Sequence, residues 1–167
     1  MQEYITINDN FTAEYTEKHS RFIATCFHCE TEAQASEIIA AQKSKYWDAR
    51  HNVYAYILSN GLSRFSDDGE PGGTAGNPMM QVLQREQLYN VVCVVTRYFG
   101  GILLGAGGLV RAYTKGCVVA LNAAQVVTME ESQRILLDIP YPMWDKINYH
   151  LQSLPQITEN TEFGASV

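Results

Sequence analysis

The chain has 167 residues, of which 46% are hydrophobic and 18% are charged, a balance that suits a compact core and excludes a disordered chain. Its formal net charge of −6 excludes a surface that binds nucleic acid over its whole area, so an anionic partner would have to meet a local patch. No apolar run approaches the ~20 residues of a membrane helix, and the N-terminus shows no secretory signal. We therefore expect a cytoplasmic protein with no membrane partner.

The first part of the chain predicts strands at residues 3–7, 21–29 and 51–59. Thr31 and Gln34 have the spacing of a capping box, which predicts a helix from there to about residue 46. Alternation in the third strand places three residues on each face of a sheet. One face carries Val53, Ala55 and Ile57, and the other carries Tyr54, Tyr56 and Leu58. Residues 60–73 are rich in Gly, Ser and Asp and predict a loop.

The middle of the chain predicts the main core. Pro78 suits the first turn of a short helix that buries Met79, Val82 and Leu83. Residues 91–98 are rich in valine and apolar on both faces, which predicts a central strand. A long helix should follow the next glycines, because small and apolar residues recur along one face. They are Leu109, Ala112, Tyr113, Gly116, Cys117, Ala120 and Leu121.

The apolar pattern breaks at residues 128–134, where Glu130 and Glu131 stand together. This break predicts two domains, residues 1–129 and 130–167. In the second, residues 135–139 are expected to form a strand and Pro142 to open a helix. Such a piece buries too little to stand alone. We interpret it as half of a small α+β domain, or as a unit completed by packing on the first.

Cys26 and Cys29 form a C-x-x-C pattern in the strand at 21–29. Residues three apart in an extended strand point to opposite faces, so the two thiols could not share one ion. No second pair of ligands has zinc spacing. With Cys93 and Cys117, they are predicted to be buried, reduced thiols.

Residues 67–78 combine three carboxylates with four glycines. The carboxylates could bind Mg²⁺, or they could form a solvated turn that favours the N-terminus of the next helix. The glycines indicate backbone angles denied to other residues, or a close approach to another chain. This motif loop comprises Asp67, Asp68, Gly69, Glu70, Gly72, Gly73, Thr74 and Gly76.

Residues 97–113 place a second group of glycines between the central strand and the long helix, where loop amides can face an anion. The segment is not a P-loop, since Ala106 and Gly107 follow Gly105, and Val110 stands where a dinucleotide fingerprint needs glycine. The sequence thus predicts no bound cofactor and no metal. Anion binding and tight packing of a strand under a helix stay open as alternatives.

Charge favours anion binding slightly. Residues 87–129 contain no Asp or Glu, but they contain Arg97, Arg111 and Lys115. Arg111 and Lys115 share one helix face because they are four residues apart, and nearby aromatic residues can stack on unpaired bases. The predicted anion- or RNA-binding residues are Arg21, Arg50, Arg97, Gly100, Gly101, Gly105, Gly107, Gly108, Arg111 and Lys115.

Four blocks, residues 18–22, 48–51, 66–78 and 97–113, resemble the signature blocks of the YigZ/Impact family in order and spacing, as in a bacterial YigZ-type member. The resemblance implies an α+β protein whose N-terminal domain has the ribosomal protein S5 domain-2-like fold, a sheet with packed helices. It also implies a ferredoxin-like C-terminal domain, of which residues 130–167 would be a truncated beginning. Both implied domains are similar to parts of elongation factor G, which points toward the ribosome or structured RNA.

The resemblance further implies a role in translation, because eukaryotic Impact proteins are translation regulators. The leading hypothesis is therefore a non-enzymatic binding module associated with RNA or the ribosome. A protein-interaction regulator that binds no RNA is the second hypothesis. The third is a Mg²⁺-dependent phosphate-ester hydrolase that acts through Asp67, Asp68 and Glu70.

Overall fold

The computed structural model describes residues 3–155 and 157–164. It divides into two compact units, Met1–Glu131 and Ser132–Val167. The first unit contains, in chain order, β1 (Tyr4–Ile7), β2 (Phe11–Glu17), β3 (Ser20–His28), α1 (Glu32–Lys45), β4 (His51–Ile57), β5 (Ser63–Ser66), α2 (Gly76–Arg85), β6 (Val91–Tyr98), α3 (Ala106–Ala123) and β7 (Val126–Met129). The second contains α4 (Tyr141–Leu151).

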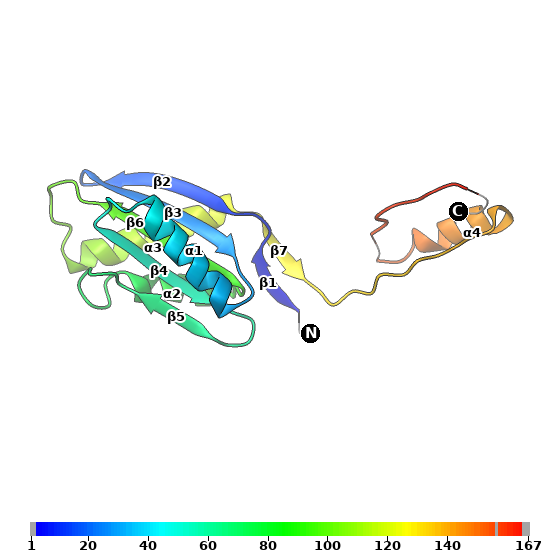
Figure 1. Ribbon diagram of the computed structural model, residues 1–167, viewed down its shortest axis with the longest axis horizontal. Helices are drawn as coiled ribbons and strands as arrows, with labels where there is room; N and C mark the ends of the chain where they lie inside the picture. The colour runs from blue at the N-terminus through cyan, green and yellow to red at the C-terminus, as the bar shows by residue number, and fades with distance from the viewer. Residues whose placement is uncertain (1–2, 156, 165–167) are drawn as a thin grey trace. The chain divides into compact units, whose positions relative to one another are not determined.

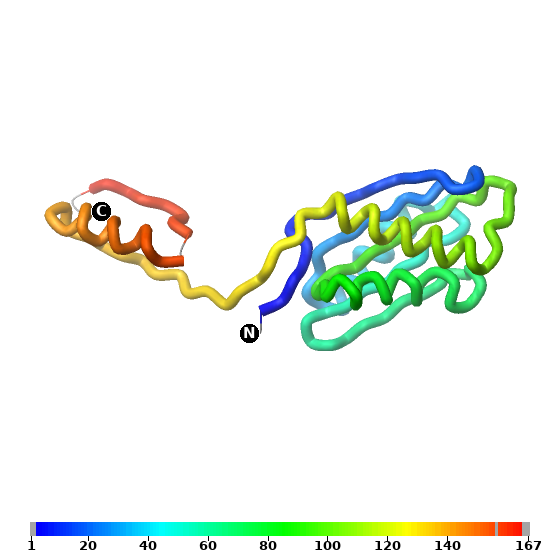
Figure 2. Tube along the Cα trace, turned by 180° about the vertical axis from the view of Figure 1, so that it is seen from behind, coloured from blue at the N-terminus to red at the C-terminus, as the bar shows by residue number. Residues whose placement is uncertain are grey.

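The first unit is built on a five-stranded antiparallel sheet with the order β2-β3-β6-β4-β5. The valine-rich strand β6 is central, as its apolar character on both faces predicts. Helix α1 covers one face of the sheet (Figure 1), and α2 and α3 cover the other (Figure 2). A separate two-stranded ladder joins β1 to β7. The predicted mixture of helices and strands in one α+β fold is confirmed, while the finer S5 domain-2-like assignment stays a prediction.

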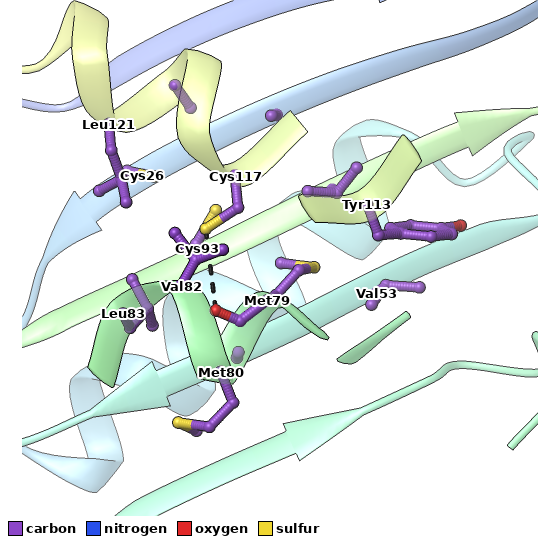
Figure 3. Close-up of a cluster of buried hydrophobic side chains, with 14 of the residues drawn as sticks. Cys26, Val53, Met79, Met80, Val82, Leu83, Cys93, Tyr113, Cys117 and Leu121 are labelled. Carbon is purple, nitrogen blue, oxygen red and sulfur yellow. Dashed lines mark hydrogen bonds between the residues drawn. The ribbon is translucent and has the colours of Figure 1, made fainter. Parts of the chain in front are cut away.

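The main core lies between the sheet and the helices α2 and α3. All seven residues predicted on the inner face of α3 are buried, as are Met79, Val82 and Leu83 of α2, and Figure 3 shows several of them facing the sheet. Strand β4 alternates as predicted, since Val53, Ala55 and Ile57 belong to this core. The opposite side chains of β4 pack in a smaller core beneath α1. The capping box of Thr31 and Gln34 is also confirmed.

The four cysteines are free and buried. Cys26 and Cys93 are paired across β3 and β6, and Figure 3 shows Cys117 of α3 close to them. Cys29 packs in the core on the α1 side instead, so the prediction that Cys26 and Cys29 face opposite sides of the sheet is confirmed. Burial raises the pKa of the Cys29 thiol to about 12, which keeps this sulfur protonated and unreactive at neutral pH.

Three strands, β2, β5 and β7, were not predicted from the sequence. β2 and β5 lie at the two edges of the sheet, where polar residues are tolerated and weaken the apolar alternation that marks a strand. β7 is four residues long and exists by pairing with β1.

The predicted strand at residues 135–139 is wrong, because this segment is neither helix nor strand. A strand needs a hydrogen-bonding partner, and the described part of the second unit contains no strand to pair with it. Helix α4 does form, with proline in its first turn as predicted. Among the described residues, no helix is long and apolar enough to cross a membrane.

Candidate functional site

Residues 67–70 form a turn that follows β5. The three carboxylates of this turn bind three different sets of partners. Asp67 Oδ1 accepts hydrogen bonds from the amides of Ala75 and Gly76 at 3.0 and 2.8 Å, and Oδ2 accepts one from Gly73 at 2.8 Å. These amides include the first donors of α2, whose N-cap residue Ala75 has no side-chain cap of its own. Asp67 thus supplies the anion that the N-terminus of α2 favours.

The Asp68 side chain binds groups on α1 and β4. Its Oδ1 accepts from Lys43 Nζ at 2.6 Å and its Oδ2 from the amide of Asn52 at 2.7 Å. The carbonyl of Asp68 accepts a hydrogen bond from His51 Nδ1 at 2.8 Å. Within the described residues, no group of three His, Cys, Asp or Glu side chains could hold a metal ion. The contacts of Asp67, Asp68 and Glu70 give no support to the Mg²⁺ site considered for them, since each carboxylate serves a different partner.

Glu70 is the centre of a buried polar cluster. Its Oε1 accepts hydrogen bonds from Arg97 Nη1 and from the Tyr113 hydroxyl, both at 2.7 Å. Arg97 Nη2 also donates to Ser20 Oγ at 3.3 Å. Burial, reinforced by the nearby Glu70 carboxylate, raises the pKa of Tyr113 far above its ordinary value, so its hydroxyl remains a donor. The cluster joins β3, the 67–70 turn, β6 and α3.

Arg97 is a buried structural cation. It is 5% exposed, and its guanidinium carbon lies 5.6 Å from the ring centroid of Phe22 and 5.5 Å from that of Phe99. Its charge is already paired with Glu70. The prediction that Arg97 offers an exposed charge to RNA phosphate is therefore not supported by its position.

The second glycine group brings the 99–105 loop against the turn between β2 and β3. A Cβ atom on Gly100 would lie 2.0 Å from the carbonyl carbon of His19, so no other residue fits there without moving backbone. The Gly100 amide donates to Ser20 Oγ, which connects this contact to Arg97. Gly101 and Gly105 have φ angles of 85° and 72°, and Gly107 and Gly108 lie in the first turn of α3.

The motif loop contains four further glycines, of which three are required by the backbone. Gly69 and Gly73 adopt φ angles of 86° and 76°, which favour glycine. Gly76 packs against the backbone of Ser66, since a Cβ there would lie 2.8 Å from the Ser66 carbonyl oxygen. Gly72 has open space around it, and Thr74 donates to the carbonyl of Pro71.

Two hollows open beside this cluster. The first, which we call the Glu70 cleft, has a volume of about 360 Å³. It is lined by Arg50, His51, Gly69, Glu70, Pro71, Arg97, Phe99, Leu103, Leu104, Gly105, Ala106 and Leu109. The second, which we call the α3 groove, has a volume of about 220 Å³. It is lined by Glu17, Lys18, Leu104, Gly108, Arg111, Ala112 and Lys115.

The predicted cations do not gather in one place. Arg50 lines the Glu70 cleft, whereas Arg111 and Lys115 line the α3 groove. Arg21 pairs in register with Tyr98 on the sheet face opposite Arg97, where it makes a two-point contact with Glu14 at 2.6 and 2.8 Å. The expectation that Arg21 joins the others beside the glycines is therefore wrong, because neighbouring residues of a strand face opposite sides.

Two features of the site were not predicted from the sequence. Lys18 completes the α3 groove from the β2–β3 turn, with a positive φ of 44°. The pairing of Glu70 with Arg97 was also missed, although a charged residue inside the apolar strand 91–98 signals that a buried acid must neutralise it.

The fold and the site define a class of protein: an α+β domain in which two glycine-rich loops meet around a buried Glu–Arg pair and open two hollows at one end of the sheet. The Impact N-terminal domain matches residues 18–121. The IMPACT family member YvyE of Bacillus subtilis is 39% identical over 171 residues, covering 98% of this chain and 79% of that protein. The chain therefore belongs to the IMPACT family.

Two further comparisons agree with this assignment. The IMPACT family member YigZ of Escherichia coli is 43% identical over 110 residues, which cover 63% of this chain and 53% of that protein. A crystal structure of a hypothetical protein is similar in fold, with a TM-score of 0.75 and 31% sequence identity, and covers 99% of this chain and 82% of that one. The predicted membership of the YigZ/Impact family is confirmed.

Proposed function

We propose that the chain is a non-enzymatic binding module in translation regulation that holds the phosphates of single-stranded RNA in the α3 groove. The observation that carries this proposal is the grouping of Lys18, Arg111 and Lys115 around one hollow in a chain whose net charge is −6. Such a local positive site is what an acidic protein needs in order to meet a polyanion.

The groove cations are largely free to take a ligand. Within the described residues, neither Lys18 nor Arg111 has an ion-pair partner, and both are exposed. Lys115 Nζ lies 4.7 Å from the ring centroid of Tyr15, which leaves its charge unneutralised. Glu17 is the one carboxylate in the lining, and α3 itself carries no acidic residue. The groove therefore has an excess of positive charge.

Family membership supports the link to translation, because the eukaryotic Impact proteins that the sequence resembles are translation regulators. It does not specify RNA as the ligand. A protein partner without RNA stays the alternative, and formation of a defined complex that resists nuclease would favour it.

The test is the salt dependence of binding to a fluorescent ten-nucleotide RNA, measured by anisotropy. Three cations that displace counterions from a single strand predict a slope of log affinity against log salt of about −2. Replacing Arg111 and Lys115 together with alanine should reduce that slope by about 1.4.

The matched control replaces Lys45 and Arg64, two exposed cations outside the groove, and removes the same charge. This control should keep most of the wild-type slope. A flat salt dependence in the wild type, or equal losses in the two double variants, would contradict binding in the α3 groove.

A further inference from the structure

The Glu70 cleft is left without a role by the proposed function. It shares Leu104 with the α3 groove, but its other lining residues are separate. Its volume of about 360 Å³ lies at the lower end of the roughly 300–1,000 Å³ typical of small-molecule sites. The size therefore suits a compact ligand rather than a long chain.

One wall of the cleft holds a buried side chain, Glu70, whose second carboxylate oxygen accepts no hydrogen bond from the described residues. Glu70 is 8% exposed, and both of its hydrogen bonds reach Oε1. His51 Nε2 lies 3.9 Å from Oε2, beyond hydrogen-bond range. His51 Nδ1 must carry a proton, because it faces the Asp68 carbonyl, which can only accept.

A second buried polar atom in the same wall is also unused. Arg97 Nε is buried and has no hydrogen-bond partner among the described residues. This nitrogen is closed to solvent, so the group that the wall offers to a ligand is Glu70 Oε2, an acceptor that favours an N–H donor.

The opposite side of the cleft favours an anion. Gly105 and Ala106 line it at the start of α3, an 18-residue helix whose N-cap has no side-chain hydrogen bond and whose first turn has no acidic residue. The helix dipole and the amides of that turn attract negative charge. Arg50 adds an exposed guanidinium to the same lining.

Between these two sides the lining is apolar and partly aromatic. Phe99 is 42% exposed and Leu103 is 83% exposed, and both line the cleft with Pro71. Arg97 covers one side of the Phe99 ring, which positions the ring as a stacking surface. A flat ring suits this surface better than a charged chain.

From these three features we infer that the Glu70 cleft binds a 5′-nucleoside monophosphate whose base carries an amino group. The phosphate lies at the N-terminus of α3 beside Arg50, the base packs on Phe99, and the amino group donates to Glu70 Oε2. A carboxylate accepts from the amino group of cytosine but not from the carbonyl of uracil. The same chemistry belongs to a free nucleotide and to the 5′ end of an RNA.

Calorimetric titration with cytidine and uridine 5′-monophosphates tests the inference. Wild-type protein should bind the cytidine nucleotide about tenfold more tightly, as expected for loss of one hydrogen bond to a charged group. The Ala106→Asp variant places a carboxylate where the phosphate is expected and should weaken binding about five- to tenfold. Since an acid at a helix N-terminus stabilises the helix, this loss cannot come from unfolding.

Asn122→Asp is the matched control, because it adds the same charge at the exposed far end of α3. It should bind as the wild type does. No saturable binding of either nucleotide, equal affinity for both, or unchanged affinity in Ala106→Asp would overturn the inference. Glu70→Gln should remove the preference for cytidine, because the amide can accept from the cytosine amino group and can also donate to the uracil carbonyl.

A last measurement distinguishes a free nucleotide from the 5′ end of an RNA as the ligand. It uses a variant of the α3 groove, so that RNA binding in that groove does not affect the result. In the Arg111→Ala/Lys115→Ala background, a 5′-phosphorylated cytidine pentamer that binds more tightly than the free nucleotide would assign the cleft to RNA ends. Tighter binding of the free nucleotide would assign it to the metabolite. A 5′-hydroxyl pentamer that binds as well as the phosphorylated one would overturn the phosphate site, whether or not the α3 groove binds RNA.

Discussion

Replacing Glu70 with alanine is the strongest test of the buried cluster. Arg97 is 5% exposed and has Glu70 as its ion-pair partner at 2.7 Å, so the variant leaves a buried cation without a counter-charge. Breaking a buried pair in this way typically costs about 3–5 kcal/mol. Tyr113 also loses its acceptor, which adds up to about 1 kcal/mol if the hydroxyl finds no new partner. We therefore expect the free energy of unfolding to fall by about 4 kcal/mol.

The assay is urea unfolding followed by circular dichroism, with the wild type and two comparison variants. Tyr113→Phe removes one hydrogen bond to the same carboxylate and should cost about 1.5 kcal/mol. Glu86→Ala breaks the exposed pair with Arg85 and should cost less than about 0.5 kcal/mol. A loss below about 1 kcal/mol for Glu70→Ala would refute the reasoning, since it would show that Arg97 is solvated or neutralised by some other group.

Two further predictions concern packing and protonation. Gly100→Ala should destabilise the protein by about 3 kcal/mol in the same urea assay, because its Cβ would meet the His19 backbone, whereas Gly72→Ala, which has open space around it, should change stability by less than about 1 kcal/mol. Burial raises the pKa of Cys29 from 9.0 to about 12 and so favours the protonated thiol in the folded state. The free energy of unfolding should therefore keep its full value below pH 9 and fall between pH 9 and 12, because the thiol of the unfolded chain ionises in that range. Urea midpoints measured across this range should fall less steeply for Cys29→Ala, and equal slopes for the two proteins would contradict the shift.

Local patterns in the sequence predict the elements that are defined by a buried face. The inner face of α3, the two faces of β4 and the capping box at Thr31 follow from periodicity and side-chain chemistry. The edge strands β2 and β5 do not follow, because an exposed strand is defined by its neighbour rather than by its own composition. The segment 135–139 shows the converse error, since apolar residues alone do not make a strand without a partner.

The candidate site was predicted as two loops, but its geometry was not. The glycines marked where backbone comes close, and Gly100 does contact the β2–β3 turn. Arg21 and Arg97 lie on opposite faces of the sheet, because Arg21 pairs with Tyr98 and not with Arg97. This pairing register cannot be read from the sequence alone. The pairing of Glu70 with Arg97 joins residues 27 apart, which no local pattern encodes.

The two helix N-termini beside the motif loops differ in how the chain neutralises them. Helix α2 begins against Asp67, whose two oxygens accept three loop and helix amides, so its positive end is already neutralised by the chain. Helix α3 begins at Gly105 with no such acid, and no Asp or Glu occurs in residues 87–129. The same electrostatic attraction that fixes the Asp67 turn is therefore left unsatisfied at α3. This end of the cleft is therefore where the inferred nucleotide would place its phosphate.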